Sequence, residues 1–409
     1  MSTHFLDGGA GDSVLVEGSR ISAAGRGLSA PAGAQRLKLE EGDTISVGAV
    51  NAHTHLYSGL APLGLPTPWP PPANFVQILE RVWWLLDRAL DEESLRGAAR
   101  FYIADALMCG TTSLIDHHES PWFIRGSLDV LADAAQELGI RLVTAYGATE
   151  RNRGREEGVR GLDENRRFVR NNRRSLVRGM VALHASFTVS DDTIRSSAAL
   201  CRELDVPMHV HVAEDAADVA DARKRGYPGP LERLASLGAL PTGSIVAHGV
   251  HLDPAQVRRA DDAGLWIVQN PRSNAGNRVG FSTALSSSRH VALGTDGYNA
   301  DMAAERAALR EHSLAHHENL DSETFSARCH AGHAMVSQRF GISLSSVVTA
   351  GNTADLVVRD SKGAVRHVLV NGKVVVESGS LKTGDHKAIR GQAAQQAPRL
   401  WTRMEALRQ

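Results

Sequence analysis

Two pairs of histidines have a spacing that could bind a metal ion: His53 with His55, and His209 with His211. Side chains two positions apart on a β-strand point to the same face of the sheet, so both imidazoles of a pair could reach one cation. The motif alone says little, because a chain of 409 residues with 18 histidines should contain roughly one His-x-His pair by chance. The pairs gain weight from their position in the predicted fold.

Eight short apolar runs in the middle of the chain each end in polar residues. They read ISVGAVNAHTH, TTSLIDHH, RLVTAYGATE, MVALHASF, PMHVHVAE, SIVAHG, LWIVQN and HVALGTD, with helical patterns between them. This alternation predicts a parallel sheet with crossover helices. Eight such strands fit a closed (β/α)₈ barrel, in which catalytic groups lie at the C-terminal ends of the strands. Histidines end five of the eight runs, so we expect them to gather at one rim.

A carboxylate is expected at the same rim. Asp296 ends the last run, in the segment LGTDG. When a barrel closes, its last strand lies beside its first, so Asp296 can reach the metal position of His53 and His55. Imidazoles with a carboxylate and an open water position are typical of catalytic rather than structural zinc. The spacing leaves open which histidine of the second pair joins them.

Both ends of the chain are predicted to form short strands. Residues 354–379 contain the runs ADLVVRD and RHVLVNGKVVVESG, and the pair Asn371-Gly372 between strands is a strong hairpin signal. We therefore predict an α/β fold, a (β/α)₈ TIM barrel with a small β-sandwich-like domain formed from both chain ends. The expected divisions are residues 1–48 and 351–385 for the small β domain, 49–350 for the barrel and 386–409 for a C-terminal helical tail.

Composition excludes several functional classes. The net charge is −1 and 42% of the residues are hydrophobic, which allows a large core and gives no sign of nucleic-acid binding. No apolar stretch approaches the roughly 18 residues of a membrane span, and the N-terminal residues do not have the pattern of a signal peptide. The three cysteines are widely spaced and indicate reduced thiols. We expect a cytoplasmic protein with no membrane partner.

The motifs VNAHTH, HVHVAED, VAHGVHL, QNPRSN and GTDGYNADM together resemble the amidohydrolase superfamily, in its aminohydrolase/chlorohydrolase branch. The segments WWLLDRALDEESL, IDHHESP, GSLDVL and NPRSNAGNRVG are similar, more narrowly, to SsnA-type aminohydrolases. The resemblance covers nearly the whole chain. One departure is Val47-Gly48, where the family usually has Pro-Gly before the first His-x-His pair.

The resemblance implies one divalent metal ion, Zn²⁺ or alternatively Fe²⁺, held by His53, His55, His211 and Asp296. It also implies that His209 is not a ligand. Binuclear members of the family carry a bridging lysine at the end of the fourth strand. Here that strand contains His184 and no lysine, so we predict a mononuclear site.

The resemblance also assigns catalytic roles to Glu214, His248 and Asp296. Glu214, three residues after His211, would move a proton from water to a ring nitrogen of the substrate. His248 would orient the substituents of the attacked carbon, and Asp296 would orient the nucleophile and protonate the leaving group. Each such group contributes about 10²–10⁴-fold to the rate. By spacing alone, Glu214 could equally be a solvated residue that opens a helix.

The expected reaction is the hydrolytic deamination of an amino-substituted nitrogen heterocycle, a purine, pterin, pyrimidine or triazine, by a homodimeric enzyme. The alternative is a dechlorinating, dealkylaminating or cyclic-amide hydrolase on the same scaffold. A non-catalytic barrel is a third hypothesis. The presence of every implied ligand, together with Glu214 and His248, argues against it.

Two histidines are candidates for substrate contact. His184 lies in HASFT, which resembles a His-Ala-Pro-Tyr-Thr segment whose histidine contacts substrate in the family. Alternation along a strand sends only one of His117 and His118 inward, and we favour His118.

Three loop residues are further candidates for substrate contact. Asn274 and Asn299 follow the last two strands and could bind a heterocycle edge, although asparagine often forms turns. Trp69, in a Pro-rich loop, could cap the site or belong to a rigid connection. Trp83 and Trp84 are interpreted as packing residues, and the arginine-rich segment 151–178 as a solvated helix face.

Overall fold

The computed structural model describes residues 2–9 and 11–408. Eight parallel strands pair in chain order to form the central sheet. They are β6 (Ala49–Thr54), β7 (Thr111–His118), β8 (Arg141–Ala148), β10 (Val181–Ala185), β11 (Met208–Val212), β12 (Ile245–His248), β13 (Trp266–Gln269) and β14 (Val291–Leu293). The short strand β9 (Val177–Gly179) pairs with β8 outside this order.

The sheet curls into a nearly closed barrel. A bridge joins Thr54 to Asp296, and the backbone N–H groups of Thr295 and Asp296 donate to the carbonyl of His53 at 2.9 and 3.0 Å. These contacts place the residues that follow β14 beside the end of β6. The predicted α/β barrel is confirmed, and with it the expectation that the last run lies beside the first.

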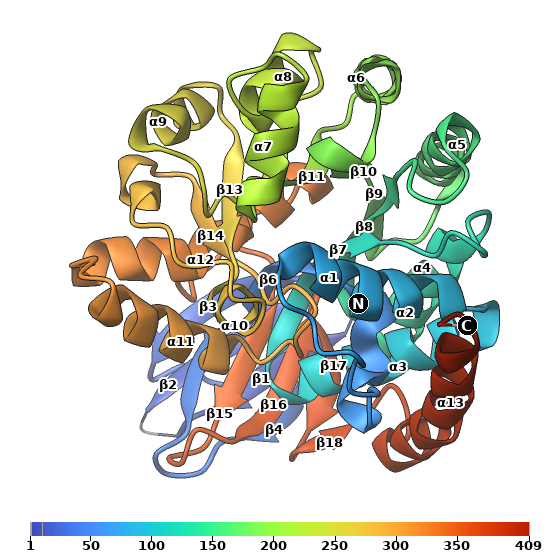
Figure 1. Ribbon diagram of the computed structural model, residues 1–409. Helices are drawn as coiled ribbons and strands as arrows, with labels where there is room; N and C mark the ends of the chain where they lie inside the picture. Colours follow the sequence, from blue (N-terminus) through green and yellow to red (C-terminus); the bar gives the residue numbers. More distant parts are fainter. Residues whose placement is uncertain (1, 10, 409) are drawn as a thin grey trace.

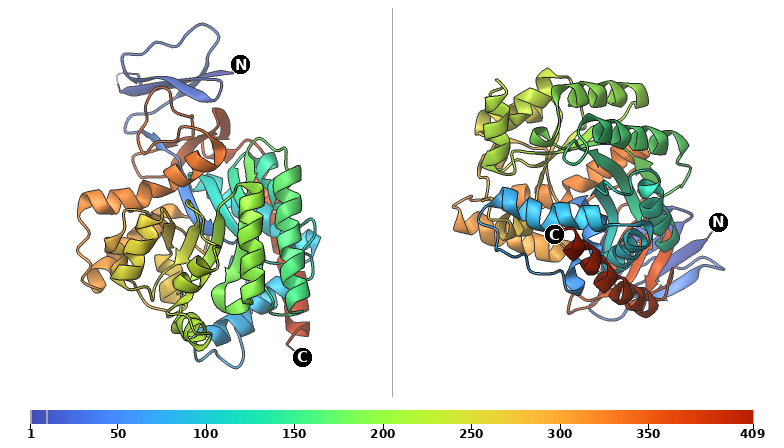
Figure 2. Two further views of the ribbon diagram at one scale, coloured as in Figure 1. Left: turned by 90° about the horizontal axis from the view of Figure 1, so that it is seen from above. Right: turned by 45° about the vertical axis from the view of Figure 1, so that its right-hand side comes forward.

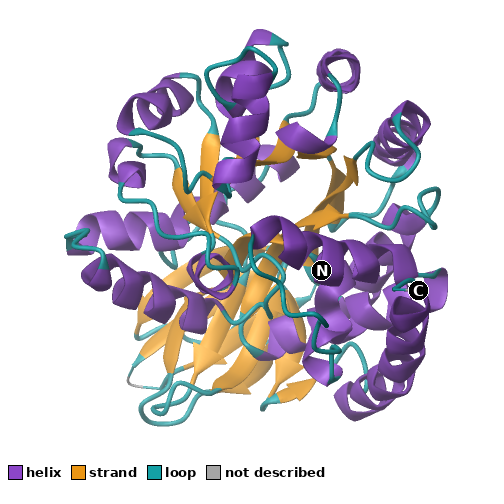
Figure 3. Cartoon of the chain, viewed as in Figure 1, coloured by secondary structure: helices purple, strands orange, loops and turns teal. Residues whose placement is uncertain are grey.

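Helices surround the strands, as Figures 1 and 3 show. They are α3 (Glu92–Met108), α4 (Ser127–Leu138), α5 (Arg155–Asn171), α6 (Asp191–Leu204), α7 (Ala216–Lys224), α8 (Pro230–Ser236), α9 (Pro254–Asp262), α10 (Pro271–Gly276), α11 (Met302–Ala315) and α12 (Ser322–Phe340). Because the strands face helices outside and a packed interior inside, β7 and β8 are buried along their whole length. This explains why the strands read as near-continuous apolar runs.

A helical segment lies across the C-terminal mouth of the barrel. It follows the 3₁₀ helix η1 (Leu56–Leu63) and consists of α1 (Phe75–Ile78), the single π-helical turn η2 (Leu79–Trp83) and α2 (Trp84–Ala89). In Figure 1, α1 and α2 pass in front of the strands. The C-terminal helix α13 (His386–Ala406) packs against η1, α2 and α3.

Strands from both chain ends form two further sheets. One contains β1 (Thr3–Asp7), β2 (Asp12–Glu17), β3 (Arg20–Arg26) and β4 (Gln35–Lys38), and the other β5 (Thr44–Val47), β15 (Leu356–Arg359), β16 (Val365–Val370), β17 (Lys373–Glu377) and β18 (Ser380–Leu381). Figure 2 shows the N-terminal strands standing apart from the barrel. Residues of both sheets share one apolar cluster, which includes Val14, Leu356 and Leu369. The predicted division into domains stays a prediction.

The hairpin between β16 and β17 turns at Asn371-Gly372, where both residues have positive φ, 52° and 74°. A Cβ at Gly372 would lie 1.9 Å from the carbonyl oxygen of Gly18, so only glycine fits there. The turn thus locks a C-terminal hairpin against the N-terminal strands. Among the described residues, no helix is long and apolar enough to cross a membrane.

Candidate metal centre and active site

Four buried side chains meet at the C-terminal rim of the barrel: His53, His55, His211 and Asp296. Asp296 Oδ1 lies 2.8 Å from His55 Nε2 and 3.3 Å from His53 Nε2. His211 Nε2 lies 3.3 Å from His55 Nε2. The structure therefore brings together, from three different strand ends, the four residues that the sequence analysis named as ligands.

Backbone carbonyls fix the orientation of two of these rings. His55 Nδ1 lies 2.5 Å from the carbonyl oxygen of His117, and His211 Nδ1 lies 2.6 Å from that of His184. A carbonyl can only accept, so both Nδ1 atoms carry a proton, and the two Nε2 atoms face each other beside Asp296 Oδ1. A histidine that binds a metal through one ring nitrogen commonly donates the other N–H in this way.

His53 is held by a neighbouring histidine. His209 Nε2 lies 2.9 Å from His53 Nδ1, and both side chains are fully buried. His209 thus lies behind His53, on the side away from Asp296, whose carboxylate contacts His53 Nε2. The spacing of His209 and His211 left the choice between them open. In the structure, His211 contacts His55 next to the carboxylate of Asp296, whereas His209 lies behind the ring of His53.

The donor set fits a divalent cation. His53 Nε2 and His248 Nε2 are buried and have no hydrogen-bond partner within residues 2–9 and 11–408. Atoms of His53, His211, His248 and Asp296 all lie within 4.8 Å of one another. Burial lowers the pKa of His53 to about 3 and that of His211 well below its usual value, whereas Asp296 outweighs burial at His55 and raises its pKa to about 9. Neutral imidazoles with one carboxylate are typical zinc ligands.

A second pair of groups lies beside this cluster. Glu214 Oε2 is 3.5 Å from His248 Nε2, while Asn277 Nδ2 donates to Glu214 Oε1 at 3.4 Å. His248 Nδ1 lies 2.9 Å from Asn274 Oδ1, which fixes the proton on Nδ1. Asn274, expected to contact substrate, therefore orients His248 instead.

The two carboxyl groups of the site have pKa values that are shifted in opposite directions. Burial, and after it the charge of Asp296, raises the pKa of Glu214 well above its usual value. Burial would raise the pKa of Asp296 too, but its contacts with the imidazoles of His53 and His55 hold it well below the usual range. Ser273 Oγ also donates to Asp296 Oδ2. Titratable pairs that differ in this way are typical of acid–base sites.

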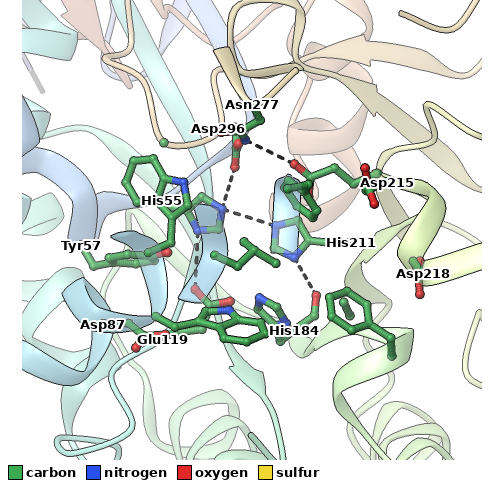
Figure 4. Close-up of a pocket in the computed structure, with 18 residues that line it drawn as sticks. His55, Tyr57, Asp87, Glu119, His184, His211, Asp215, Asp218, Asn277 and Asp296 are labelled. Atoms are coloured by element: carbon green, nitrogen blue, oxygen red, sulfur yellow. Dashed lines mark hydrogen bonds and ion pairs between the residues drawn. The ribbon is translucent and has the colours of Figure 1, made fainter. Parts of the chain in front are cut away.

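His55, His211, Glu214, Asn277 and Asp296 line one pocket. The segment from α1 to α2 supplies an apolar wall that includes Phe75, Leu79 and Trp84. Figure 4 shows His55 and His211 across the middle, with Asp296 and Asn277 on one side and Glu119, Asp87 and His184 on the other. An apolar wall with a few polar groups at one side is typical of a site for a small organic ligand.

Most of the predicted substrate contacts lie elsewhere. His184 does line the pocket. The preference for His118 was wrong: its Nε2 contacts Ser120 Oγ at 2.8 Å, and His117 is the residue whose ring lies near His55 and His211. The strand turns His117 toward the barrel interior, so alternation sends its neighbour the other way.

The predicted contacts of Asn299 and Trp69 are not found either. Asn299 is exposed and its side-chain oxygen accepts from Arg272 Nη1 at 2.8 Å, while Trp69 is 80% exposed. Neither is among the residues that line the pocket. Trp83 and Trp84, interpreted as packing residues, do line the pocket.

Sequence reasoning missed two buried carboxylates of the pocket wall, Glu119 and Asp87. Glu119 directly follows the end of β7. Its position as an acidic residue at the C-terminal end of a barrel strand is a sequence signal that could have identified it. Asp87 lies in α2, and an acid within a helical pattern is usually solvated. Only the packing of α2 over the barrel mouth buries it.

Known proteins share this sequence pattern and fold. The sequence model of the Amidohydrolase family matches residues 44–375. The 5′-deoxyadenosine deaminase of Methanopyrus kandleri is 29% identical over 394 residues, 86% of each chain. The 5-methylthioadenosine/S-adenosylhomocysteine deaminase 2 of Archaeoglobus fulgidus is 29% identical over 298 residues, 70% of this chain and 66% of its own.

Two solved structures have the same fold over almost the whole chain. An adenosine deaminase from Xanthomonas campestris with bound zinc has a TM-score of 0.80 at 24% identity, covering 96% of this chain and 94% of its own. The atrazine chlorohydrolase TrzN from Arthrobacter aurescens TC1, complexed with zinc, has a TM-score of 0.79 at 21% identity, covering 95% of both chains. At this level of identity the likeness concerns the fold alone.

Proposed function

The chain belongs to the amidohydrolase family, and on that basis we propose that it hydrolyses an amino-substituted nitrogen heterocycle and releases ammonia. One observation carries the proposal. Glu214 Oε2 lies 3.5 Å from His248 Nε2, and Glu214 lines the same pocket as His55, His211 and Asp296. A carboxyl group that can take up and release a proton therefore lies beside the position where a metal and a substrate would meet.

His53, His55, His211 and Asp296 would hold one divalent metal, with Zn²⁺ our first choice because zinc is bound in similar folds, and Fe²⁺ the alternative. Such an ion, when bound, supplies the Lewis acidity that makes a water molecule nucleophilic near neutral pH. The remaining steps fall to side chains of the chain itself.

Glu214 accepts a proton from the attacking water and delivers it to the ring nitrogen beside the attacked carbon. Its raised pKa suits a group that must both take and give a proton near neutral pH. His248, whose Nδ1 proton is fixed by Asn274, presents its Nε2 lone pair toward Glu214 and can accept a hydrogen bond from the same water. The attacking water would then donate one hydrogen bond to Glu214 and one to His248 Nε2.

Asp296 completes the reaction. Its carboxylate orients the nucleophile, takes the remaining proton from the hydroxyl that has been added to the carbon, and passes this proton to the amino group, so that the carbon–nitrogen bond breaks and ammonia leaves. Ser273 holds Oδ2 of this carboxylate, which leaves Oδ1 toward the histidines. The relatives named as deaminases of 5′-deoxyadenosine and 5-methylthioadenosine make adenine compounds the first substrates to test.

A cytoplasmic location and a homodimeric state are also expected, and both stay predictions. The free thiols of Cys109, Cys201 and Cys329 are compatible with the reducing cytoplasm. The homodimer is a prediction that measurement of the molar mass in solution can check.

The test is an ammonia-release assay on metal-loaded protein with purines, pterins, pyrimidines and triazines. We expect ammonia from at least one class, and Glu214→Gln should lower the rate by about 10²–10⁴-fold with metal content unchanged. Asp215→Asn is the matched control, because Asp215 also lines the pocket but caps α7 through Ala217. Chloride, an alkylamine or a ring-opened acid as the only product would contradict deamination.

A further inference from the structure

The proposed metal ligands lie at the place where the barrel closes. Every other neighbouring pair among the eight strands is joined by a ladder of paired residues. Between β6 and the segment that follows β14, the described part of the chain has the single bridge of Thr54 with Asp296. We call this junction the seam. His53 and His55 flank Thr54, so three of the four proposed ligands lie on the two sides of the seam.

Three backbone hydrogen bonds cross the seam beside these ligands. The N–H groups of Thr295 and Asp296 share one acceptor, the carbonyl oxygen of His53, at 2.9 and 3.0 Å. The N–H of His55 donates to the carbonyl of Asp296 at 3.3 Å. Asp296 has a φ of 52°, in the left-handed region that residues with a Cβ rarely adopt. Few backbone bonds therefore hold Asp296, and they hold it in a disfavoured conformation.

The hydroxyl group of Tyr102 joins the two sides of the seam. Tyr102 comes from α3 and is buried. Its oxygen lies 2.5 Å from Thr54 Oγ1 on one side of the seam and 3.0 Å from Thr295 Oγ1 on the other. It also donates to the carbonyl oxygen of Tyr298 at 2.9 Å, again on the side of Asp296. A single hydroxyl group thus contacts the residue between two ligands and the residue before the third.

Asn51 completes the network around this hydroxyl group. Its Nδ2 donates to Thr295 Oγ1 at 2.7 Å, and its Oδ1 accepts from the backbone N–H of Thr295 at 3.1 Å. We call the side chains of Asn51, Thr54, Tyr102 and Thr295 the seam network. All four are buried, and none has a polar atom without a partner. A buried network that is fully satisfied in this way favours one rigid arrangement.

That arrangement suits a bound metal ion. Asp296 Oδ1 lies 3.3 Å from His53 Nε2, and His55 Nε2 lies 3.3 Å from His211 Nε2. Ligand atoms about 2.0–2.1 Å from a tetrahedral zinc ion lie roughly 3.3 Å from one another. Asp296 Oδ1 and His55 Nε2 are closer, at 2.8 Å. The width of the seam therefore already holds the ligand atoms close to the separation that an ion requires.

We propose that Tyr102 is a positioning residue, whose hydroxyl group holds the two sides of the seam at the separation that the metal ligands need. Tyr102 does not line the pocket, so it acts through the ligands and not on the substrate. Without the hydroxyl group, binding of the ion must itself order the seam, and such ordering lowers affinity. This inference rests on the proposed function, because it takes His53, His55 and Asp296 to be ligands.

Tyr102→Phe tests the inference, since it removes the hydroxyl group and keeps the ring. We expect the zinc dissociation constant, measured by competition with a chromophoric chelator, to rise by about tenfold to a hundredfold. About one equivalent should still bind at saturating zinc, because every ligand remains. A merely structural role would lower the melting temperatures of the apoprotein and the metal-loaded protein alike and leave the dissociation constant unchanged. That result would overturn the inference.

Two substitutions of Thr54 test the contact from the other side. Thr54→Val keeps the size of the side chain and removes its hydroxyl group, so it should weaken zinc binding as Tyr102→Phe does. Thr54→Ser keeps the hydroxyl group and should bind zinc nearly as the wild type does. The double variant Tyr102→Phe with Thr54→Val should lose less than the product of the two single effects, because both remove the same contact. A loss equal to that product would overturn the shared contact.

Tyr146→Phe is the matched control. Tyr146 is buried in the same apolar cluster as Tyr102, and its hydroxyl oxygen accepts from the N–H of Ser120 at 3.4 Å, away from the seam. Its zinc dissociation constant should equal that of the wild type. An equal loss in Tyr146→Phe and Tyr102→Phe would mean that general loosening of the core weakens zinc binding, and would overturn the inference. If Tyr102→Phe does not fold, the comparison of Thr54→Val with Thr54→Ser decides.

Failure of the inference and failure of the proposed function give different results. If the wild type binds zinc and Tyr102→Phe binds it equally well, the seam inference falls and the proposed function is untouched. If zinc binding changes as expected but no heterocycle releases ammonia, the proposed reaction falls and the role of Tyr102 stands, because the dissociation constants are measured without substrate. A wild type that binds no zinc would overturn both the metal site and the inference.

Discussion

Replacing His209 with asparagine should weaken metal binding without abolishing it. His209 Nε2 lies 2.9 Å from His53 Nδ1, both rings are fully buried, and a His53 that binds metal through Nε2 would donate its Nδ1 proton to His209. Asparagine is too short to reach that proton, so His53 would lose the contact that holds its ring with Nε2 toward Asp296. The four proposed ligands would all remain.

The magnitude follows from the burial of the donor. A buried N–H that loses its acceptor costs about 1–3 kcal/mol, which corresponds to roughly fivefold to 150-fold in an equilibrium constant. Loss of such a partner behind a metal-binding histidine typically lowers metal affinity by about tenfold to a hundredfold. Both estimates agree on a partial loss. Removal of His53 itself should instead prevent stoichiometric binding.

The assay is the zinc dissociation constant, measured by competition with a chromophoric chelator. His209→Gln should recover part of the affinity, because its side-chain oxygen can reach the position of the imidazole Nε2. His118→Asn is the matched control, since His118 is equally buried but bonds to Ser120. The melting temperature of each apoprotein separates lost affinity from lost stability.

Two results would refute this reasoning. An unchanged dissociation constant in His209→Asn would mean that His53 needs no support from His209. A loss as complete as that of His53→Ala would mean that His209 is itself a ligand, and the positions of the second histidine pair would have to be reinterpreted.

Three further predictions concern metal dependence, folding and pH. Chelation should abolish ammonia release, and added Zn²⁺ should restore it in the wild-type protein but not in His55→Ala; restored activity in that variant would argue against His55 as a ligand. Asp355→Ala leaves the guanidinium of Arg141 buried without the two contacts of 2.8 and 3.0 Å, so the free energy of unfolding should fall by about 3–5 kcal/mol in denaturant titrations. The exposed pair of Arg399 is the control, and Arg399→Ala should cost less than about 1 kcal/mol; equal losses would contradict the role of burial. Burial raises the pKa of Asp218 from 3.8 to about 7, so the folded state binds its proton more tightly than the unfolded state. The free energy of unfolding of the wild type, relative to Asp218→Asn, should therefore fall by up to about 1.4 kcal/mol per pH unit as the pH rises from 4 to 7, and a difference that does not change with pH would contradict the shift.

The pattern of apolar runs alone predicts the barrel and places His53, His55 and Asp296 together at its rim. The two-residue period of a strand puts His53 and His55 on one face, and barrel closure brings Asp296 beside them. Both placements follow from strand geometry and from the order of the strands in the barrel, and the order of the apolar runs in the sequence gives that strand order. The choice between His209 and His211 needed the family resemblance, because both have the same spacing and strand.

The substrate side of the pocket could not be predicted in the same way. Alternation shows that either His117 or His118 points inward, but the strand's rotation about its axis decides which, and that depends on packing with neighbouring strands. Asp87 and Trp84 enter the pocket because α2 lies across the barrel mouth. Nothing in the helical period of that segment indicates which face meets the barrel.

Metal content per chain tests the central claim most directly. Elemental analysis of the purified protein and of the alanine variants of His53, His55, His211 and Asp296 would count the bound ions. We predict about one equivalent of a divalent metal in the wild type, as expected for a mononuclear catalytic site, and a clear loss in each variant. Two equivalents in the wild type, or a full equivalent retained in His55→Ala, would contradict the proposed site.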